Sequence, residues 1–425
     1  MATDDEIGNL IKRADLLRQQ AAKVFQPRTP ITTKELFAGR WTQLTEVSDA
    51  VNQPGLHAVI FGERGVGKSS LANVIHPTIY VLDNEEGRQS ERLVVKAVAN
   101  TGDTFSKIWH RLFVDLRWPD RFDEDKLAST REAFSLGDEL SVDDVRRVVS
   151  ATNGAVFIVD EFDQASRDVS KAFTELIKAL SDLCVDTTIV LVGVSDTVSH
   201  LIADHGSIDR AITQVPLKRM KPEELRQIIQ KAETALQITF DEDAAKLVCH
   251  MSQGLPHYTH LIGLHAVRAA ADKFSVDHVR REHVFEALRK AITQAEHTVT
   301  TLHSTAIHSS QKTALYRQVL FACALAAARS HDPLGYFSPS GVTEPLGRVL
   351  GKEVEIATFN NHLREFCEDK RGTVLERDGQ PWGFRYRFRN PLLVPYVFMD
   401  GMEKGLATDQ GLLDLLTSND DFSLS

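Results

Sequence analysis

Cysteine is scarce in this 425-residue sequence, with four thiols that lie far apart in the chain. Without a CxxC pair, the sequence predicts neither a disulfide framework nor a cysteine-based zinc site. No apolar run reaches the roughly 18 residues of a membrane-spanning helix, and the acidic N-terminus lacks the apolar core of a signal peptide. We therefore expect reduced thiols, a cytoplasmic location and no association with a membrane.

Basic residues are also in deficit. Lys and Arg total 49 against 59 Asp and Glu, which gives a net charge of −10. This balance excludes broad coating of a nucleic acid but leaves room for a small basic patch on one domain. The sixteen histidines show no HExxH spacing, so we expect them to be solvated or buried rather than zinc ligands.

Apolar runs of strand length alternate with helical patterns in the first half of the chain. An amphipathic helix is predicted first, over residues 5–25, and Pro27 and Pro30 end it. The strand-like runs that follow are 58–61, 93–99, 155–159, 188–194 and 214–217. The helical patterns between them include 68–75, 104–116 and 167–183. This alternation predicts an α/β core with a parallel sheet that helices cover on both faces.

Strand signals disappear after Met220. The next helices are predicted over 222–236, 241–252, 256–273 and 280–296, and the polar stretch that ends at residue 311 is predicted to be a linker. Beyond it come helical patterns at 312–328, 341–350 and 356–369 and two short strands at 373–377 and 384–389. Three helices and a hairpin in this order are typical of a winged helix. Its third helix is expected to bury Ile356, Phe359, Leu363 and Phe366.

A glycine-rich segment directly after the first strand fits the pattern GxxxxGK[ST] at every required position. Its candidate nucleotide contacts are Gly62, Glu63, Arg64, Gly65, Val66, Gly67, Lys68, Ser69 and Ser70. The glycines let backbone N–H groups surround a β-phosphate, and the start of the following helix adds its positive end. Lys68 would reach the β- and γ-phosphate oxygens, and the Ser69 hydroxyl would hold Mg²⁺.

A second half of the same site is predicted at the end of the 155–159 strand. Asp160 would hold Mg²⁺, and Glu161 would orient and deprotonate the attacking water. For Asp163 two interpretations stay open, a catalytic role and a cap for the helix near residue 167. A pair of carboxylates beside a lysine and a serine, rather than a Ser-His-Asp or Cys-His set, points to phosphoryl chemistry.

These motifs resemble those of AAA+ ATPases of the origin-recognition and replication-initiator clade, with STAND signalling ATPases close behind. FAGR at 37–40 resembles their box near the adenine, which implies nucleotide contacts for Phe37 and Arg40. DEFD at 160–163 resembles their Walker B motif. The strand that ends in GVSD resembles their sensor-1 strand, with Asp196 where the family usually has Asn.

The resemblance also implies an arginine finger and a lid. SIDRAITQVPL at 207–217 resembles the finger segment and makes Arg210 the finger; the alternative is an ordinary surface arginine. A finger acts on a neighbouring subunit, so this interpretation requires a homo-oligomer. At the start of a lid helix, His257 replaces the initiators' sensor-2 arginine, whereas Gly254 and Pro256 satisfy the G-x-P of STAND proteins. Pro256 and His257 are thus expected near the nucleotide.

The resulting organisation is an AAA+ αβα core with a helical lid and a winged helix. Its predicted parts are an N-terminal helix (1–29), a nucleotide-binding core (30–220), the lid (221–296), a linker (297–311), the winged-helix domain (312–402) and an acidic tail (403–425).

The winged helix would carry the contacts to a target. Its outward-facing candidates are Asn360, Asn361 and Arg364 on the third helix and Arg385, Arg387 and Arg389 on the hairpin, with Trp382 at the tip. The charge surplus around them is small, so both DNA and protein stay open as targets. One hypothesis is an initiator or transposition-regulator ATPase that acts on DNA. The other is a STAND-like signalling or antiphage-defence ATPase that senses a partner and controls a separately encoded effector.

Overall fold

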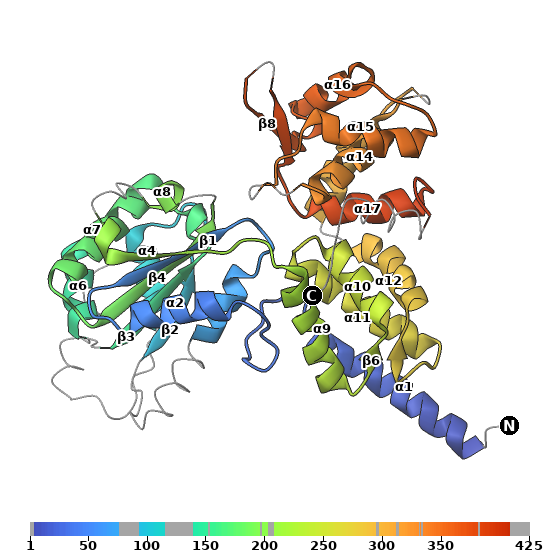
Figure 1. Ribbon diagram of the computed structural model, residues 1–425. Helices are drawn as coiled ribbons and strands as arrows, with labels where there is room; N and C mark the ends of the chain where they lie inside the picture. Colours follow the sequence, from blue (N-terminus) through green and yellow to red (C-terminus); the bar gives the residue numbers. More distant parts are fainter. Residues whose placement is uncertain are drawn as a thin grey trace. The chain divides into compact units, whose positions relative to one another are not determined.

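The structure is a computed structural model of the chain (Figure 1). It describes residues 4–75, 93–114, 139–151, 154–195, 198–202, 208–294, 297–311, 314–330, 332, 335–380 and 383–408. The chain divides into two compact units. We call Pro30–Lys218 the core unit, and Met1–Thr29 together with Arg219–Ser425 the helical unit. The helical unit thus groups the N-terminal helix with the segments assigned from the sequence to a lid and a winged helix.

A parallel five-stranded sheet forms the centre of the core unit, as the sequence predicts. Its strands are β1 (His57–Gly62), β2 (Val94–Val98), β3 (Ala155–Asp160), β4 (Thr187–Val194) and β5 (Ile212–Pro216). Their order across the sheet is β2-β3-β4-β1-β5, so β4 separates the strand of the glycine-rich loop from the strand of Asp160. All six residues of β3 are buried, which explains its uninterrupted apolar sequence.

Helices pack on this sheet and bury an aromatic cluster. They are α2 (Trp41–Val51), the helix over 68–75, α4 (Phe105–Val114), α6 (Val142–Ala151) and α7 (Arg167–Asp182), with a short turn α8 (Val198–Leu201). The Trp109 ring lies 5.2 Å from the ring of Phe157 and stacks on that of Phe173 at 5.8 Å. Trp109 joins strand β3 to helices α4 and α7 in this way. Helices α2 and α6 were not assigned from the sequence.

The helical unit begins with α1 (Asp4–Val24), close to the predicted 5–25. The four helices predicted after Met220 are observed as α9 (Pro222–Leu236), α10 (Glu242–Ser252), α11 (Pro256–Asp272) and α12 (Arg281–Gln294), with short strands β6 (Thr239–Phe240) and β7 (His278–Val279). Phe25, just after α1, lies so close to α11 that a Cβ on Gly263 would come within 2.4 Å of its ring. A glycine at 263 therefore allows this close packing.

Most of the predicted linker 297–311 is a helix, α13 (His297–Ile307), so that prediction was wrong. Val299, His303 and Ala306 form its buried face. Because His303 is polar, the buried positions of this helix do not form an apolar repeat in the sequence, and the helix was missed. It contacts the Tyr396 ring at 5.1 Å, and its Nε2 lies 3.4 Å from a carboxylate oxygen of Asp400.

The helix–hairpin module, our name for residues 314–408, has the element order that the sequence predicts. It contains α14 (Tyr316–Ala328), α15 (Pro339–Leu350), α16 (Ile356–Glu365), the antiparallel pair β8 (Leu375–Asp378) and β9 (Arg385–Phe388), and α17 (Leu393–Glu403). Phe337 and Tyr386 exchange two backbone hydrogen bonds of 2.8 Å, which join residue 337 to β9 through an isolated β-bridge. On α16, Ile356 is 40% exposed and not buried as predicted, because it is the first residue of the helix.

The module is joined to the rest of the helical unit by a buried hydrogen bond. The Tyr258 hydroxyl on α11 donates to the Leu392 carbonyl, just before α17, across 2.6 Å. The predicted acidic tail lies outside the described residues from 409 onward. Within the described ranges, the longest and most apolar helices still fall short of what a bilayer crossing requires.

Candidate nucleotide-binding site

The glycine-rich loop joins the end of β1 to the helix that begins at Lys68. Three of its glycines, Gly62, Gly65 and Gly67, have positive φ values of 151°, 87° and 98°. At Gly62 a Cβ would come within 2.2 Å of the Leu217 carbonyl oxygen, so a side chain cannot fit there. These backbone conformations form the turn that a phosphate-binding loop needs.

Lys68 is folded back over this loop. Its Nζ donates to the carbonyl oxygens of Gly62 and Glu63, at 3.0 and 2.8 Å, and the residue is only 7% exposed. Burial lowers the pKa of Lys68 to about 8, although the carboxylates of Asp163 and Asp160 act in the opposite direction. A buried ammonium group held by two neutral carbonyls is well placed to exchange them for phosphate oxygens.

Asp160 ends β3 and is 5% exposed. One of its carboxylate oxygens accepts the N–H of Glu161 at 2.9 Å, and the other lies 2.7 Å from Nζ of Lys96 on β2. Glu161 follows with a left-handed φ of 54° and an exposed side chain. Such a backbone is strained in a non-glycine residue, and strain of this kind often marks functional positions.

Asp163 does not cap the helix near residue 167, so that alternative was wrong. The cap of α7 is Ser166, which accepts the N–H of Val169. Asp163 instead accepts the N–H of Val194, at the end of β4, across 2.8 Å. It thereby ties the segment after β3 to the neighbouring strand.

The 37–40 box supports the loop. Arg40 is buried with a left-handed φ of 63°, and its guanidinium donates to the Lys218 carbonyl and, at 3.5 Å, to that of Val66. Phe37 is buried with its ring 6.5 Å from Trp41. Arg40 therefore connects the loop to the residues after β5.

Arg210 is exposed in a short turn directly before β5, and Asp196 lies outside the described residues. Pro256 and His257 belong to the helical unit, where they begin α11. Nδ1 of His257 lies 2.7 Å from the Pro27 carbonyl oxygen. The roles of these four residues toward a nucleotide stay predictions.

The histidines that the structure describes do not gather into a metal site. Among the described residues, no group of His, Cys, Asp and Glu could hold a metal ion. His260 is buried, and burial lowers its pKa to about 4, so it is neutral.

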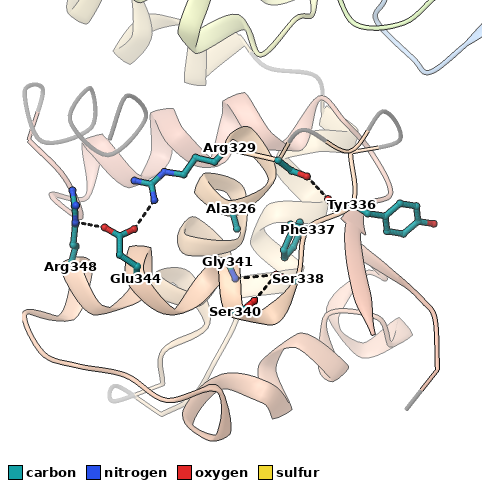
Figure 2. Close-up of a pocket in the computed structure, with 10 residues that line it drawn as sticks. Ala326, Arg329, Tyr336, Phe337, Ser338, Ser340, Gly341, Glu344 and Arg348 are labelled. Carbon is teal, nitrogen blue, oxygen red and sulfur yellow. Dashed lines mark hydrogen bonds and ion pairs between the residues drawn. The ribbon is translucent and has the colours of Figure 1, made fainter. Parts of the chain in front are cut away.

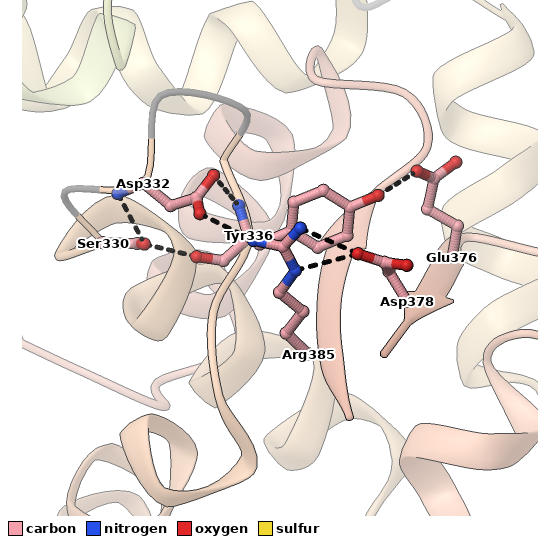
Figure 3. A network of polar contacts seen from close by, with 6 residues as sticks. All are labelled: Ser330, Asp332, Tyr336, Glu376, Asp378 and Arg385. Carbon is pink, nitrogen blue, oxygen red and sulfur yellow. Dashed lines mark hydrogen bonds and ion pairs between the residues drawn. The ribbon is translucent and has the colours of Figure 1, made fainter. Parts of the chain in front are cut away.

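Arg385 and Arg387 of the hairpin pair with carboxylates, and Figure 3 shows the contacts of Arg385. Arg385 pairs with Asp378 at 2.8 Å and with Asp332 at 3.1 Å, and Nε of Arg387 donates to Glu376. Both guanidinium groups also lie over the Tyr336 ring, at 4.3 and 4.9 Å. The other target candidates, Asn360, Asn361, Arg364 and Arg389, are exposed as predicted, whereas Trp382 lies outside the described residues.

A hollow of about 510 Å³ lies between α14 and α15 of the module (Figure 2). Arg329 and Arg348 line it, and both pair with Glu344. The two arginines thus share one carboxylate, and the lining residues are separate from the glycine-rich loop.

Two residues of the site were missed from the sequence, Lys96 and Asn73. Asn73 follows Ser69 by one helical turn, and its Oδ1 accepts from Lys96 at 2.7 Å. The sequence signal for Lys96 was its position as a single charged residue within the otherwise apolar run LVVKAVA.

The family model of novel STAND NTPase 1 matches residues 30–262. A Walker-type ATPase of Pyrococcus abyssi is similar in structure, with a TM-score of 0.51 and 15% identity over 88% of this chain and 99% of that one. The ORC2 protein of Aeropyrum pernix, solved as ADPNP–ADP complexes, has a TM-score of 0.50 and 13% identity, with coverage of 90% and 98%. No curated protein sequence matches. These likenesses agree with an AAA+ fold of ORC/Cdc6 type, and the chain belongs to the novel STAND NTPase 1 family of P-loop NTPases.

Proposed function

We propose that the protein binds ATP and ADP with Mg²⁺ and hydrolyses ATP, as a switch rather than a motor. The observation that carries this proposal is the buried Lys68 amine, held over a loop of positive-φ glycines at the same sheet edge as Asp160. In that place Lys68 and the loop N–H groups would bind and orient the β- and γ-phosphates.

The residues present fit a magnesium ion. Hydroxyl and carboxylate oxygens are the ligands that Mg²⁺ prefers, and Ser69 and Asp160 supply one of each. The Asp160 carboxylate already has a cation, Lys96, at 2.7 Å. When bound, Mg²⁺ would neutralise phosphate charge and polarise the transferred group.

Glu161 is the proposed base. Its backbone follows Asp160 directly, and its side chain is exposed at the sheet edge where the loop lies. A carboxylate there can accept the proton of a water that attacks the γ-phosphate.

Hydrolysis would be completed by a second copy of the chain. Arg210 is exposed before β5 and can be presented to a neighbour's nucleotide, where its guanidinium would stabilise transition-state charge. ATP would then control assembly, and the lid residues Pro256 and His257 would report the nucleotide state.

The helix–hairpin module, which we propose to be a winged helix, would act on the target. A partner protein is favoured over DNA because Arg385 and Arg387 already have carboxylate partners. The match to a STAND family also favours a protein partner, as in a STAND-like signalling or defence ATPase that controls a separately encoded effector. DNA contact through Asn360, Asn361, Arg364 and Arg389 is the competing candidate, as in an initiator or transposition regulator.

Two substitutions test the ATPase. Lys68→Ala should abolish nucleotide binding, whereas Glu161→Gln should bind ATP, stop hydrolysis and trap the assembled state, as seen by light scattering. Lys178→Ala, an exposed lysine on α7, is the matched control and should behave as the parent. A Glu161→Gln protein that hydrolyses ATP at the parent rate contradicts the assignment of the base.

The target is tested with the trapped Glu161→Gln protein. DNA contact predicts a shift of duplex DNA at about 50 mM salt that disappears as salt rises. Absence of any shift contradicts the DNA candidate, and a stable, stoichiometric complex with a co-purified protein supports the other.

A further inference from the structure

Lys96 lies in the middle of strand β2, between the buried residues Val95 and Ala97. It is paired in register with Ile158 of β3, so Asp160, two residues further on, lies on the same face of the sheet. The lysine side chain extends along this face until its Nζ is 2.7 Å from Oδ2 of Asp160. Its side chain is 25% exposed.

A second contact fixes the position of this amine. Nζ of Lys96 donates to Oδ1 of Asn73 at 2.7 Å. The Asn73 amide is itself oriented, because its Nδ2 donates to the Ile31 carbonyl at 3.3 Å, which leaves its oxygen for the lysine. Asn73 lies one helical turn after Ser69, on the same side of the helix. The amine is therefore held beside Asp160, one of the two proposed magnesium ligands, by a residue of the helix that carries Ser69, the other.

We propose that Lys96 is a built-in counter-cation of the metal site. It neutralises Asp160 when Mg²⁺ is absent, so that a nucleotide can bind without the metal, and it weakens the binding of Mg²⁺ itself. This inference rests on the proposed function, since it concerns the same phosphates and the same metal.

The reason is electrostatic. An unpaired carboxylate at the sheet edge would repel the phosphates, and in metal-free protein only a protein cation can offset it. When Mg²⁺ arrives at Asp160, two cations compete for one carboxylate and repel each other. The Lys96 charge thus raises metal-free nucleotide affinity and lowers the advantage that Mg²⁺ confers.

A merely structural Lys96 would act differently. If it only anchored β2 to the helix, its loss would weaken nucleotide binding equally with and without Mg²⁺. The two roles are therefore separated by the ratio of the two affinities, which does not depend on hydrolysis.

The experiment measures ADP binding to the full chain by calorimetry, in EDTA and in saturating Mg²⁺. Lys96→Met should lose about tenfold affinity in EDTA, keep its affinity in Mg²⁺, and require less Mg²⁺ for half-maximal enhancement. Lys96→Arg keeps the charge and should remain near the parent in both buffers. Equal affinity losses in the two buffers, or no change in either, would overturn the proposal.

A second substitution tests the same idea without touching Lys96. Asp160→Asn leaves the lysine charge uncompensated, so its metal-free affinity for ADP should exceed that of the parent. The double variant Lys96→Met with Asp160→Asn should return close to the parent value in EDTA. An Asp160→Asn protein with weakened metal-free binding contradicts the counter-cation role.

The parent protein separates this inference from the proposed function. A folded parent that binds no nucleotide in either buffer contradicts both. A parent that binds nucleotide, with Lys96→Met indistinguishable from it, contradicts the counter-cation role alone.

Discussion

The Asp163 carboxylate accepts the backbone N–H of Val194 across 2.8 Å and so connects the segment after β3 to the end of β4. The segment after β3 approaches the end of β4 closely here, since a Cβ on Gly193 would lie 3.1 Å from the same carboxylate oxygen. Burial lowers the pKa of Lys68, and Asp163 is the acidic group that acts most strongly to raise it. The Asp163 side chain therefore both fixes the segment after β3 against β4 and influences the charge state of Lys68.

We expect Asp163→Ala to lower the free energy of unfolding by about 1–3 kcal/mol, because the Val194 N–H loses its acceptor. Chemical denaturation measures this. Asp163→Asn keeps an acceptor oxygen and should cost less, so equal stabilities of the two variants would contradict the hydrogen-bond explanation.

Nucleotide affinity should fall as the pH rises through about 8. Burial lowers the pKa of Lys68 to about 8, so above this pH the free protein loses the charge that binds phosphate. The affinity should fall by at most about tenfold per pH unit, which is about 1.4 kcal/mol of binding free energy. Calorimetry in buffers of different ionisation enthalpy should detect the proton that the protein takes up on binding.

Lys68→Arg provides the control for this pH dependence. Arginine stays charged, so the affinity of that variant should be flat across the same window, whatever its absolute value. A parent whose affinity does not change between pH 7 and pH 9 would contradict a lowered pKa.

Arg210→Ala should bind ATP normally and hydrolyse it roughly 10³-fold more slowly, if the arginine acts on a neighbouring subunit. Mixing it with Glu161→Gln protein should recover part of the activity, because the second variant supplies Arg210 to the intact sites of the first. Arg167→Ala, another exposed arginine of the core unit, should have no effect. Failure of the mixture to recover any activity argues against a shared site.

Tyr258→Phe should destabilise the helix–hairpin module by about 1 kcal/mol, because the Leu392 carbonyl loses its buried donor. Hydrogen exchange of α17 amides should report the change, while the amides of the core sheet keep their protection. Uniform loss of protection through both units would show that this hydrogen bond is not local to the module.

The strands of the core were predictable because their sequences are nearly continuous apolar runs. Strand β3 is buried at all six positions, so its sequence lacks the polar residues that recur along an exposed helix. Helix α13 was missed for the opposite reason, since a buried histidine stands at the centre of its inner face. The glycine-rich loop was predictable because local chain geometry alone dictates its residues.

The contacts between elements were not predictable. Lys96 contacts Asp160 only because β2 and β3 are neighbours in the sheet, and the sequence of neither strand determines the strand order. Likewise, strand alternation placed Arg385 and Arg387 on one face of the hairpin. It could not reveal that Asp378 and Glu376 on the facing strand pair with them.

Two successive side chains at the start of α11 hold distant parts of the chain. His257 bonds to Pro27, two residues before the boundary between the units, and Tyr258 bonds to Leu392 beside α17. The first turn of α11 is thus a shared attachment point within the helical unit, so a change in this turn would disturb the segment after α1 and the segment before α17 together.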